Sequence, residues 1–179
     1  KAVNFGFLYG MQARKFVDYA LNSYGQTFTL KEATHIRELF FAKYSRLLPW
    51  HKEQEQLCEM QGGVSNLFGR FRRLPDIYSS NKWERAGAAR RAINTPVQGS
   101  GSDLLISAVT QINKELKGIA WIGATVHDSI IGECHIEDQE MVDATIRRIM
   151  KHPKVLNDFG VTLRVPLDVD IGWGPWGTH

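Results

Sequence analysis

A histidine and an aspartate stand together in the middle of the apolar stretch "IAWIGATVHDSIIGECH". The stretch predicts two buried strands that meet in a tight polar turn at His127 and Asp128. A carboxylate at such a tip is held rigidly and points outward, which suits a divalent cation, because hard cations prefer oxygen ligands on a stiff frame. An aspartate also stabilises a turn without any metal, because its side chain hydrogen-bonds to the nearby backbone. On this pattern alone, the turn role is favoured.

A second set of polar residues lies in "RRAINTPVQGSGSD". Arg90, Asn94 and Gln98 are four residues apart, so they share one face of a helix. Such a row can reach the purine N3 and pyrimidine O2 acceptors of a nucleic-acid minor groove, which are common to all base pairs. Contacts of this kind test the shape of a base pair without reading its sequence. The alternative is an ordinary polar helix face, on which Pro96 makes the spacing approximate.

The opening "KAVNFGFLYGM" carries Lys1, Phe5 and Tyr9 at the same spacing, beside Gly6 and Gly10. The ammonium group can bind phosphates, and the rings can pack on a sugar and stack on a base. The glycines would let flat groups approach the backbone. The alternative is a core helix with buried aromatic side chains, which is the commoner reason for such a stripe.

Two further carboxylates, Asp168 and Asp170, alternate in "VTLRVPLDVDIGW", which predicts a last strand. They would share one face of that strand and could bind a metal. The solvated side of an edge strand is the favoured interpretation.

The stretch from Arg70 to Arg91 is rich in positive charge, although the whole chain of 179 residues has a net charge of only +3. Its basic residues are Arg70, Arg72, Arg73, Lys82, Arg85, Arg90 and Arg91, and its acidic residues are Asp76 and Glu84. A polyanion-binding surface and a solvated helix face are equally compatible with this pattern.

The rest of the composition excludes several classes of protein. No apolar run is long enough to span a membrane, and no signal-peptide pattern is present. Cys58 and Cys134 form no CxxC pair, so we expect free thiols in a reducing compartment and no structural zinc.

The periodicities place these residues on an α+β chain with helices first and an antiparallel sheet later. The first expected elements are a helix over 1–23 and a helical region from Thr29 to about Met60, which Pro49 breaks or kinks. They are followed by a β-hairpin over 61–77, a long helix bent at Pro96, the hairpin around His127, a helix over 137–152 and the last strand. Thr29 and Glu32 form a capping-box pattern at the start of the second helical region. A domain change is expected near residue 62.

In order along the chain, these stretches resemble the DNA polymerase I family (family A). "KAVNFGFLYGM" is similar to the family's fingers motif, "NLFGRFRRLPDI" to the hairpin before the long palm helix, and "RRAINTPVQGSGSDLL" to that helix. "TVHDSIIGE" resembles the metal-binding hairpin, and "VPLDVDIGWGPW" the C-terminal strand and tail. Each motif alone is weak, but their shared order is specific. The resemblance implies a helical fingers portion over 1–61 and a palm portion over 62–179.

The resemblance also implies roles for the opening residues. Lys1 matches the lysine that contacts the incoming triphosphate, and it is expected to take part in catalysis. Phe5 matches the position that packs on the nucleotide sugar and influences 3′-hydroxyl discrimination. Tyr9 matches the tyrosine that stacks near the templating base.

The palm residues receive their roles in the same way. Arg90, Asn94 and Gln98 match residues near the primer–template minor groove, and His127 matches a residue close to the primer terminus. Asp128 matches one of the two catalytic aspartates that bind metal. The implied reaction adds dNTPs to a primer 3′ end by two-metal phosphoryl transfer, with two Mg²⁺ ions and a second carboxylate ligand from outside this chain.

Two departures from the family pattern bear on these expectations. The family usually has Glu after the catalytic aspartate, whereas this chain has Ser129, as single-subunit phage RNA polymerases do. The motifs with the other catalytic aspartate, the thumb and the exonuclease domain would all lie upstream of Lys1. We therefore expect the chain to be inactive until an upstream polymerase half, in the same protein or as a separate chain, completes it.

Two other classes of function remain as alternatives. One is a non-catalytic module that binds primer–template DNA, and the other is an enzyme like the single-subunit RNA polymerases. The expected location is the cytoplasm of a bacterium or of a phage-infected host, with no membrane partner.

Overall fold

The computed structural model describes residues 2–175. The chain forms two compact units, one ending at Val97 and the other beginning at Gln98, and each is described by itself. The expected division near residue 62 separates two functional portions, which this grouping does not test, so it stays a prediction. No helix within residues 2–175 is both long enough and apolar enough to cross a membrane.

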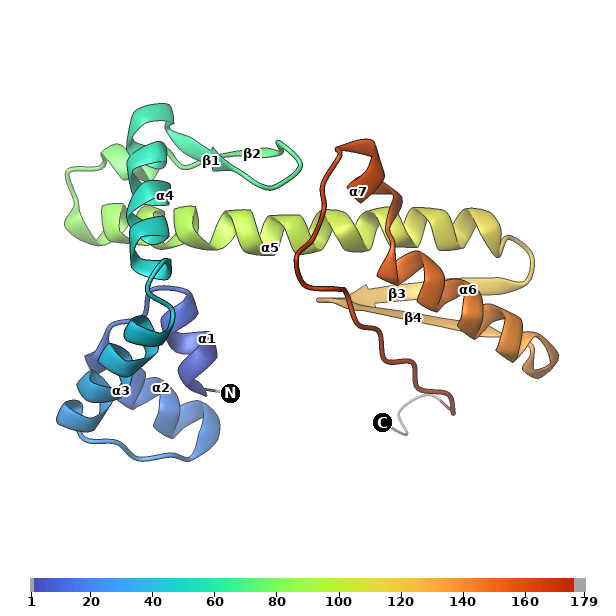
Figure 1. Ribbon diagram of the computed structural model, residues 1–179, viewed down its shortest axis with the longest axis horizontal. Coiled ribbons are helices and arrows are strands. Elements are labelled where there is room, and N and C mark those ends of the chain that lie inside the picture. The colour runs from blue at the N-terminus through green and yellow to red at the C-terminus, as the bar shows by residue number, and fades with distance from the viewer. Residues whose placement is uncertain (1, 176–179) are drawn as a thin grey trace. The chain divides into compact units, whose positions relative to one another are not determined.

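The first unit is mainly helical (Figure 1). Its elements are α1 (Ala2–Leu8), α2 (Ala13–Tyr24), α3 (Leu30–Lys43), α4 (Leu47–Gln61), β1 (Gly63–Ser65), β2 (Phe71–Arg73), the 3₁₀ helix η1 (Pro75–Tyr78) and the first part of α5 (Lys82–Glu115).

Aromatic side chains fill the core between α1, α2 and α3. The ring of Phe7 is fully buried, and its centroid lies 4.6 Å from that of Phe16 and 5.7 Å from that of Phe40. These distances are typical of favourable packing between aromatic rings. Because α1 has only seven residues, packing of this kind rather than intrinsic helix propensity must stabilise it.

The predicted helix over 1–23 is two helices, so that prediction was wrong in its length. The backbone of Gly10 has a φ of +77°, a left-handed conformation that ends a helix and that glycine adopts at little cost. The amides of Gly10 and Met11 donate to the carbonyls of Phe7 and Gly6, which closes the end of α1. Tyr9 therefore lies in the turn after α1 and not on the helix.

Two local signals in the next helices can be compared with the structure. The capping box of α3 is confirmed: the Glu32 amide donates to Thr29 Oγ1 at 3.2 Å, and the Thr29 amide donates to the Glu32 carboxylate at 2.8 Å.

The break between helices comes at 44–46, before Pro49, which lies in the first turn of α4. The first turn tolerates proline because its N–H groups have no partner within the helix.

The predicted hairpin after α4 is confirmed, and it packs with α4 and α5. Its antiparallel strands pair Gly63 with Arg73 and Ser65 with Phe71. A second core joins these elements, with buried Cys58, Val64, Leu74, Ile77, Ala88 and Ala92.

The long helix is confirmed and is not broken at Pro96, and the bend expected there stays a prediction. The helix α5 has 34 residues, from Lys82 to Glu115, and Pro96 lies inside it. The boundary between the two units falls inside it, between Val97 and Gln98.

The second unit contains the rest of α5, a hairpin of β3 and β4, and the helices α6 and α7 (Figure 1). Its other elements are β3 (Ala120–Val126), β4 (Ser129–Cys134), the 3₁₀ helix η2 (Ile136–Asp138), α6 (Gln139–Lys151) and α7 (Lys154–Asp158). A third core joins α5, the sheet and α6 around Ala108, Ile112, Leu116, Val142 and Ile149.

The hairpin of β3 and β4 has the predicted strands and turn, but not the predicted burial. The antiparallel strands pair Ala120 with Cys134 and Val126 with Ser129, with an irregularity between Ile122 and Ala124. Most residues of β3 are exposed, so the expectation of two buried strands was wrong. Within residues 2–175 the sheet has two strands, and the third core packs against one of its faces.

The predicted last strand was also wrong. The described part of the tail, residues 161–175, contains no strand. The Val169 carbonyl accepts a hydrogen bond from the Arg147 side chain at 2.8 Å instead of pairing with another strand. Asp168 and Asp170 therefore do not share the face of a strand. Overall, the expected α+β class with helices and small antiparallel sheets is confirmed.

Candidate functional site

The carboxylate of Asp128 lies exposed at the tip of the β3–β4 hairpin. The turn has only two residues between Val126 and Ser129, and His127 adopts a left-handed φ of 56°, which is uncommon for residues other than glycine. The Ser129 hydroxyl donates to the Val126 carbonyl at 2.8 Å. Ser129, which stands where the family usually has Glu, thus helps to close the turn that presents Asp128.

The described residues contain no group of three or more His, Cys, Asp or Glu side chains arranged to hold a metal ion. Asp128 fits a metal as one exposed oxygen ligand, and the remaining ligands of a two-metal site would have to come from elsewhere. Of the two candidates in the tail, Asp168 accepts a hydrogen bond from the Val169 amide at 3.0 Å, and its carboxylate lies 3.6 Å from the ammonium of Lys151. A nearby cation competes with a metal for the same carboxylate, so Asp128 is the better candidate.

Of the opening stripe, Phe5 lies on α1 and Tyr9 lies in the turn that follows it. Phe5 has 48% of its surface exposed, so part of this side chain is accessible to a ligand. Tyr9 is half-buried in the turn that follows. Lys1 lies outside the described residues, so its expected contact with a triphosphate stays a prediction.

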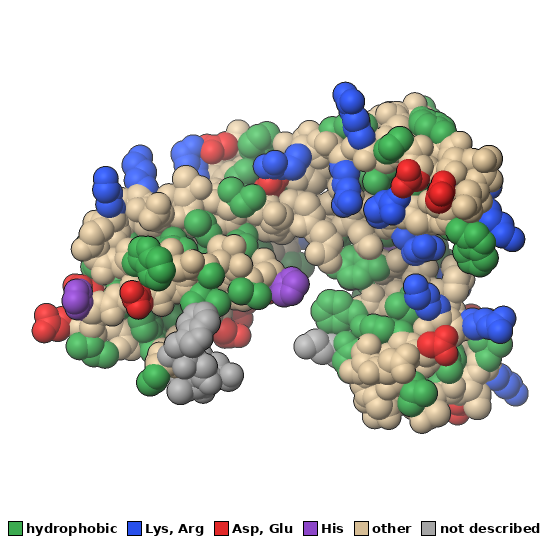
Figure 2. Space-filling model, turned by 180° about the vertical axis from the view of Figure 1, so that it is seen from behind, with side chains coloured by type: hydrophobic (Ala, Val, Ile, Leu, Met, Phe, Trp, Pro, Cys, Tyr) green, Lys and Arg blue, Asp and Glu red, His purple; other side chains and the backbone are tan. Residues whose placement is uncertain are grey.

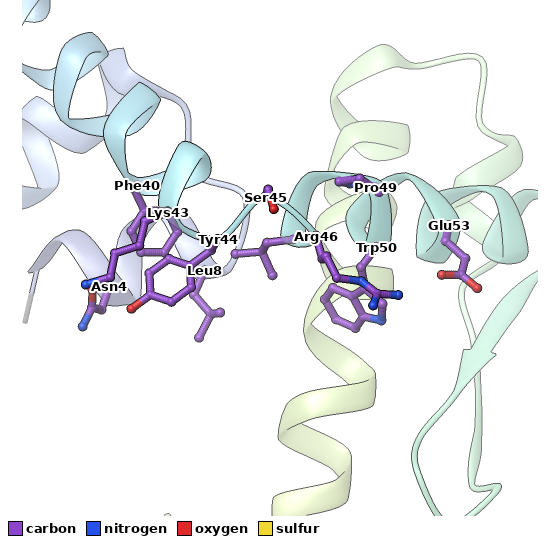
Figure 3. A pocket seen from close by; sticks show the side chains of 11 residues that line it. Asn4, Leu8, Phe40, Lys43, Tyr44, Ser45, Arg46, Pro49, Trp50 and Glu53 are labelled. Atoms are coloured by element: carbon purple, nitrogen blue, oxygen red, sulfur yellow. The ribbon is translucent and has the colours of Figure 1, made fainter. Parts of the chain in front are cut away.

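A cavity of about 800 Å³ opens on the neighbouring face of α1 (Figure 3). It is lined by Asn4, Leu8, Phe40, Lys43, Tyr44, Ser45, Arg46, Leu47, Pro49, Trp50 and Glu53. Its α1 residues, Asn4 and Leu8, directly precede Phe5 and Tyr9 in the sequence. The cavity therefore lies beside Phe5 and Tyr9, neither of which lines it.

Two of the three residues predicted to contact the minor groove, Arg90 and Asn94, lie in the same unit. Arg90 is exposed and Asn94 is half-buried on the same helix, four residues apart, whereas Gln98 begins the second unit. The Asn94 Oδ1 atom is buried with no hydrogen-bond partner among the described residues. A buried polar atom without a partner is unfavourable, so this amide is a candidate for contact with a ligand.

Several arginines of the basic stretch have partners within the chain. A guanidinium nitrogen of Arg91 lies 2.5 Å from the Asp76 carboxylate, and Arg85 donates to the Ser79 carbonyl at 2.6 Å. These two side chains brace the segment between the hairpin and α5. The sequence pattern does not separate such bracing residues from those available to a polyanion.

The structure adds one residue that the sequence patterns missed. His51 on α4 is buried and contacts the end of α1, with its Nε2 atom 2.9 Å from the Leu8 carbonyl oxygen. Burial lowers the pKa of His51, and the positive charge of Arg37 contributes to the same effect. No local pattern marks His51, because its partner is 43 residues away.

A second network that the sequence did not reveal fixes the tail against α6. The Asp143 carboxylate accepts hydrogen bonds from the side chains of Arg147 at 2.6 Å and Trp173 at 3.0 Å, and both lower its pKa. Arg147 also donates to the Val169 carbonyl, so α6 holds the tail without a strand pairing.

Comparisons with known proteins agree with the order of the motifs. Residues 1–178 match the family model described as DNA polymerase family A. The chain is 35% identical to DNA polymerase I of Geobacillus stearothermophilus over 178 residues, and 32% identical to that of Deinococcus radiodurans over 176 residues. In both cases 98% of this chain is covered, but only 19% and 17% of the relative.

A solved structure is also similar: the POL domain of Pol1 from M. smegmatis, in complex with DNA primer-template and dNTP. The TM-score is 0.83 with 27% sequence identity, and the match covers 97% of this chain and 29% of the other. The chain thus spans less than a third of the length of each of these three proteins. Its motifs, the exposed Asp128 turn and the match over residues 1–178 together show that the chain belongs to DNA polymerase family A.

Proposed function

We propose that this chain is the C-terminal fingers and palm portion of a template-directed DNA polymerase that adds dNTPs to a primer 3′ end. The observation that carries the proposal is the family match over residues 1–178, within which Asp128 stands exposed at the tip of the β3–β4 hairpin. The similar Pol1 domain, which was solved with primer-template and dNTP, supports the assignment of both ligands.

In this proposal each candidate residue has a role that its position permits. Phe5 packs on the sugar of the incoming nucleotide, and Tyr9 stacks near the templating base. Lys1 neutralises the charge of the triphosphate. Arg90 and Asn94 contact the primer–template minor groove from α5.

Gln98 is assigned to the same groove, and His127 to the primer terminus. Asp128 is the residue of this chain that would hold Mg²⁺. When bound, Mg²⁺ neutralises charge on the reacting phosphates and lowers the pKa of the attacking hydroxyl. The other ligands would come from the upstream part of the polymerase, so the chain by itself is expected to be inactive.

The test is primer extension by the complete polymerase carrying Asp128→Asn. This change keeps the size of the side chain and removes the charge that binds the metal, so extension should be lost while affinity for primer–template DNA is retained. Glu137→Gln, an exposed carboxylate on η2, is the matched control and should extend normally.

Two results would contradict the proposal. Normal turnover by Asp128→Asn, with loss of activity in Asp168→Asn or Asp170→Asn, would place the metal ligand in the tail. Binding of primer–template DNA with no Mg²⁺-dependent extension by the complete wild-type protein would instead favour a non-catalytic module.

A further inference from the structure

The cavity beside α1 has no role in the function proposed above. Its volume of about 800 Å³ and its largely apolar wall with a few polar groups are typical of sites that bind small molecules. The residues that line it belong to α1, to α3 and α4, and to the connection between these two helices. The cavity is therefore built entirely within the first unit.

Aromatic side chains form much of the cavity wall. Phe40, in the last turn of α3, is buried, and the centroid of its ring lies 4.9 Å from that of Tyr44. Trp50 contributes a third ring from the start of α4. Figure 3 shows that Tyr44 and Trp50 extend to the same side of the α3–α4 connection. Because 46% of Tyr44 is exposed, its ring has free surface on which another flat group can pack.

The cavity also carries charged side chains, the cations Lys43 and Arg46 and the carboxylate Glu53. The Lys43 ammonium lies 5.8 Å from the centroid of the Tyr44 ring. Within residues 2–175 none of the three charged side chains makes an ion pair. Two cations are thus available to a negatively charged group beside the aromatic wall.

The surroundings of the cavity favour the same sign of charge. Figure 2 shows Lys and Arg side chains over much of the face of the first unit that is turned to the viewer. A surface rich in one sign of charge raises the local concentration of small ions of the opposite sign. We therefore expect an anion rather than a cation to enter the cavity.

Asn4 and Leu8 form the α1 side of the cavity, one helical turn apart. Phe5, which is expected to pack on the nucleotide sugar, directly follows Asn4 in the same helix. A helix of seven residues depends on its packing contacts for stability. A molecule in the cavity would add contacts to α1 and so stabilise the helix that carries Phe5.

We propose that the cavity binds a small molecule that combines flat aromatic rings with one negatively charged group, and that this ligand strengthens nucleotide binding. Its rings would pack against Tyr44 and Trp50, and its charged group would face Lys43 and Arg46. By holding α1, the ligand reduces the conformational freedom that this helix loses when a nucleotide binds. The effect on nucleotide binding rests on the function proposed above, whereas the site itself does not.

The first experiment is a fluorescence titration of the complete polymerase with two probes. Anilinonaphthalene sulfonate carries aromatic rings and a negative charge, and N-phenyl-naphthylamine has the same rings without the sulfonate. The wild-type protein should bind the sulfonate more tightly, by about threefold or more. Tyr44→Ala and Trp50→Ala should weaken both probes by about fivefold, because each variant removes a ring from the wall.

The charge variants separate the two parts of the ligand. Lys43→Gln and Arg46→Gln should each weaken the sulfonate by about threefold and leave the neutral probe unchanged. Lys31→Gln, which removes an exposed lysine on α3, and Trp121→Ala, which removes an exposed tryptophan on β3, are the matched controls. Both controls should bind the two probes as the wild-type protein does.

The second experiment tests the effect on nucleotide binding. The polymerase is bound to a primer–template whose primer ends in a dideoxynucleotide, so that the next dNTP binds without being incorporated. Saturating sulfonate should raise the affinity for this dNTP by about threefold. Because coupling between two binding sites is reciprocal, saturating dNTP should raise the affinity for the sulfonate by the same factor.

The contrary outcomes are distinct for each part. The site is overturned if the wild-type protein binds both probes equally, or if Tyr44→Ala and Arg46→Gln bind them as the wild-type protein does. Because Tyr44 and Arg46 are both exposed, neither outcome depends on a variant that disturbs the core. An unchanged affinity for dNTP overturns the coupling. If the proposed function fails instead, the wild-type protein extends no primer, while its binding of the sulfonate still depends on Tyr44 and Arg46.

Discussion

The Nε2 atom of His51 lies 2.9 Å from the carbonyl oxygen of Leu8, so α4 holds the last residue of α1. A carbonyl only accepts, so Nε2 must carry the proton and act as the donor. Carbonyls in the last turn of a helix lack partners within that helix, and this bond supplies one. Since α1 carries Phe5 and leads directly into Tyr9, His51 helps to position both residues.

Replacing His51 with Leu should destabilise the first unit. The change keeps an apolar side chain in the buried site but leaves the Leu8 carbonyl without its donor, which costs about 1–3 kcal/mol of the free energy of unfolding. Urea denaturation would measure this loss. His35→Leu, at an exposed position on α3, should change the stability far less, and equal losses in both variants would show that the bond to Leu8 contributes nothing.

The same histidine should make the stability depend on pH. Its pKa in the folded state is lowered by burial, and in the unfolded state it is near the ordinary value of about 6.5. Below about pH 6.5 the unfolded chain therefore binds the proton more readily than the folded one, so stability is lost on acidification and is fully present above that pH.

The measurement is the free energy of unfolding between pH 7.5 and 5 for the wild-type and the His51→Leu proteins. The stability of the wild-type protein should fall more steeply towards pH 5, because the variant lacks this group. Parallel curves would show that His51 has the same pKa in both states.

Thr29→Ala should remove the capping box of α3. The Glu32 amide loses its acceptor, and the cost of such an N-cap replacement is typically about 0.5–2 kcal/mol. Thr34→Ala on the same helix is the matched control, because the Thr34 hydroxyl donates to the Leu30 carbonyl in the helix interior, where such bonds add little. Thermal unfolding that ranks Thr34→Ala as the more damaging change would contradict the capping role.

Phe5→Tyr tests the predicted contact with the nucleotide sugar. Because 48% of Phe5 is exposed, the added hydroxyl has room. It could replace the missing 3′-hydroxyl of a dideoxynucleotide as a hydrogen-bond partner, so incorporation of ddNTP relative to dNTP should increase.

Competition between ddNTP and dNTP in primer extension gives the ratio directly. Phe71→Tyr, a 42% exposed phenylalanine on β2, should leave this ratio at the wild-type value. An unchanged ratio in Phe5→Tyr would mean that Phe5 does not face the sugar.

Elements whose signals are local were predictable from the sequence. The capping box of Thr29 and Glu32 lies within four residues, and so does the two-residue turn at His127 and Asp128. The hairpin after α4 begins at the glycine pair 62–63, has Gly69 in its turn and is followed by Pro75. In each case the residues that decide the conformation are neighbours in the chain, so their pattern is visible without the fold.

The sequence by itself therefore determined the order of helices and hairpins, the exposure of Asp128 at a turn, and the motifs that resemble DNA polymerase family A. Only the tertiary structure decided that the tail forms no strand in its described part, because Arg147 takes the carbonyl that a strand partner would need. It likewise decided that His51 holds the end of α1, and that Trp83 remains exposed. These features depend on contacts between residues that are far apart in the sequence, or on the absence of such contacts at a side chain. The periodicity of the sequence contains no information about these contacts.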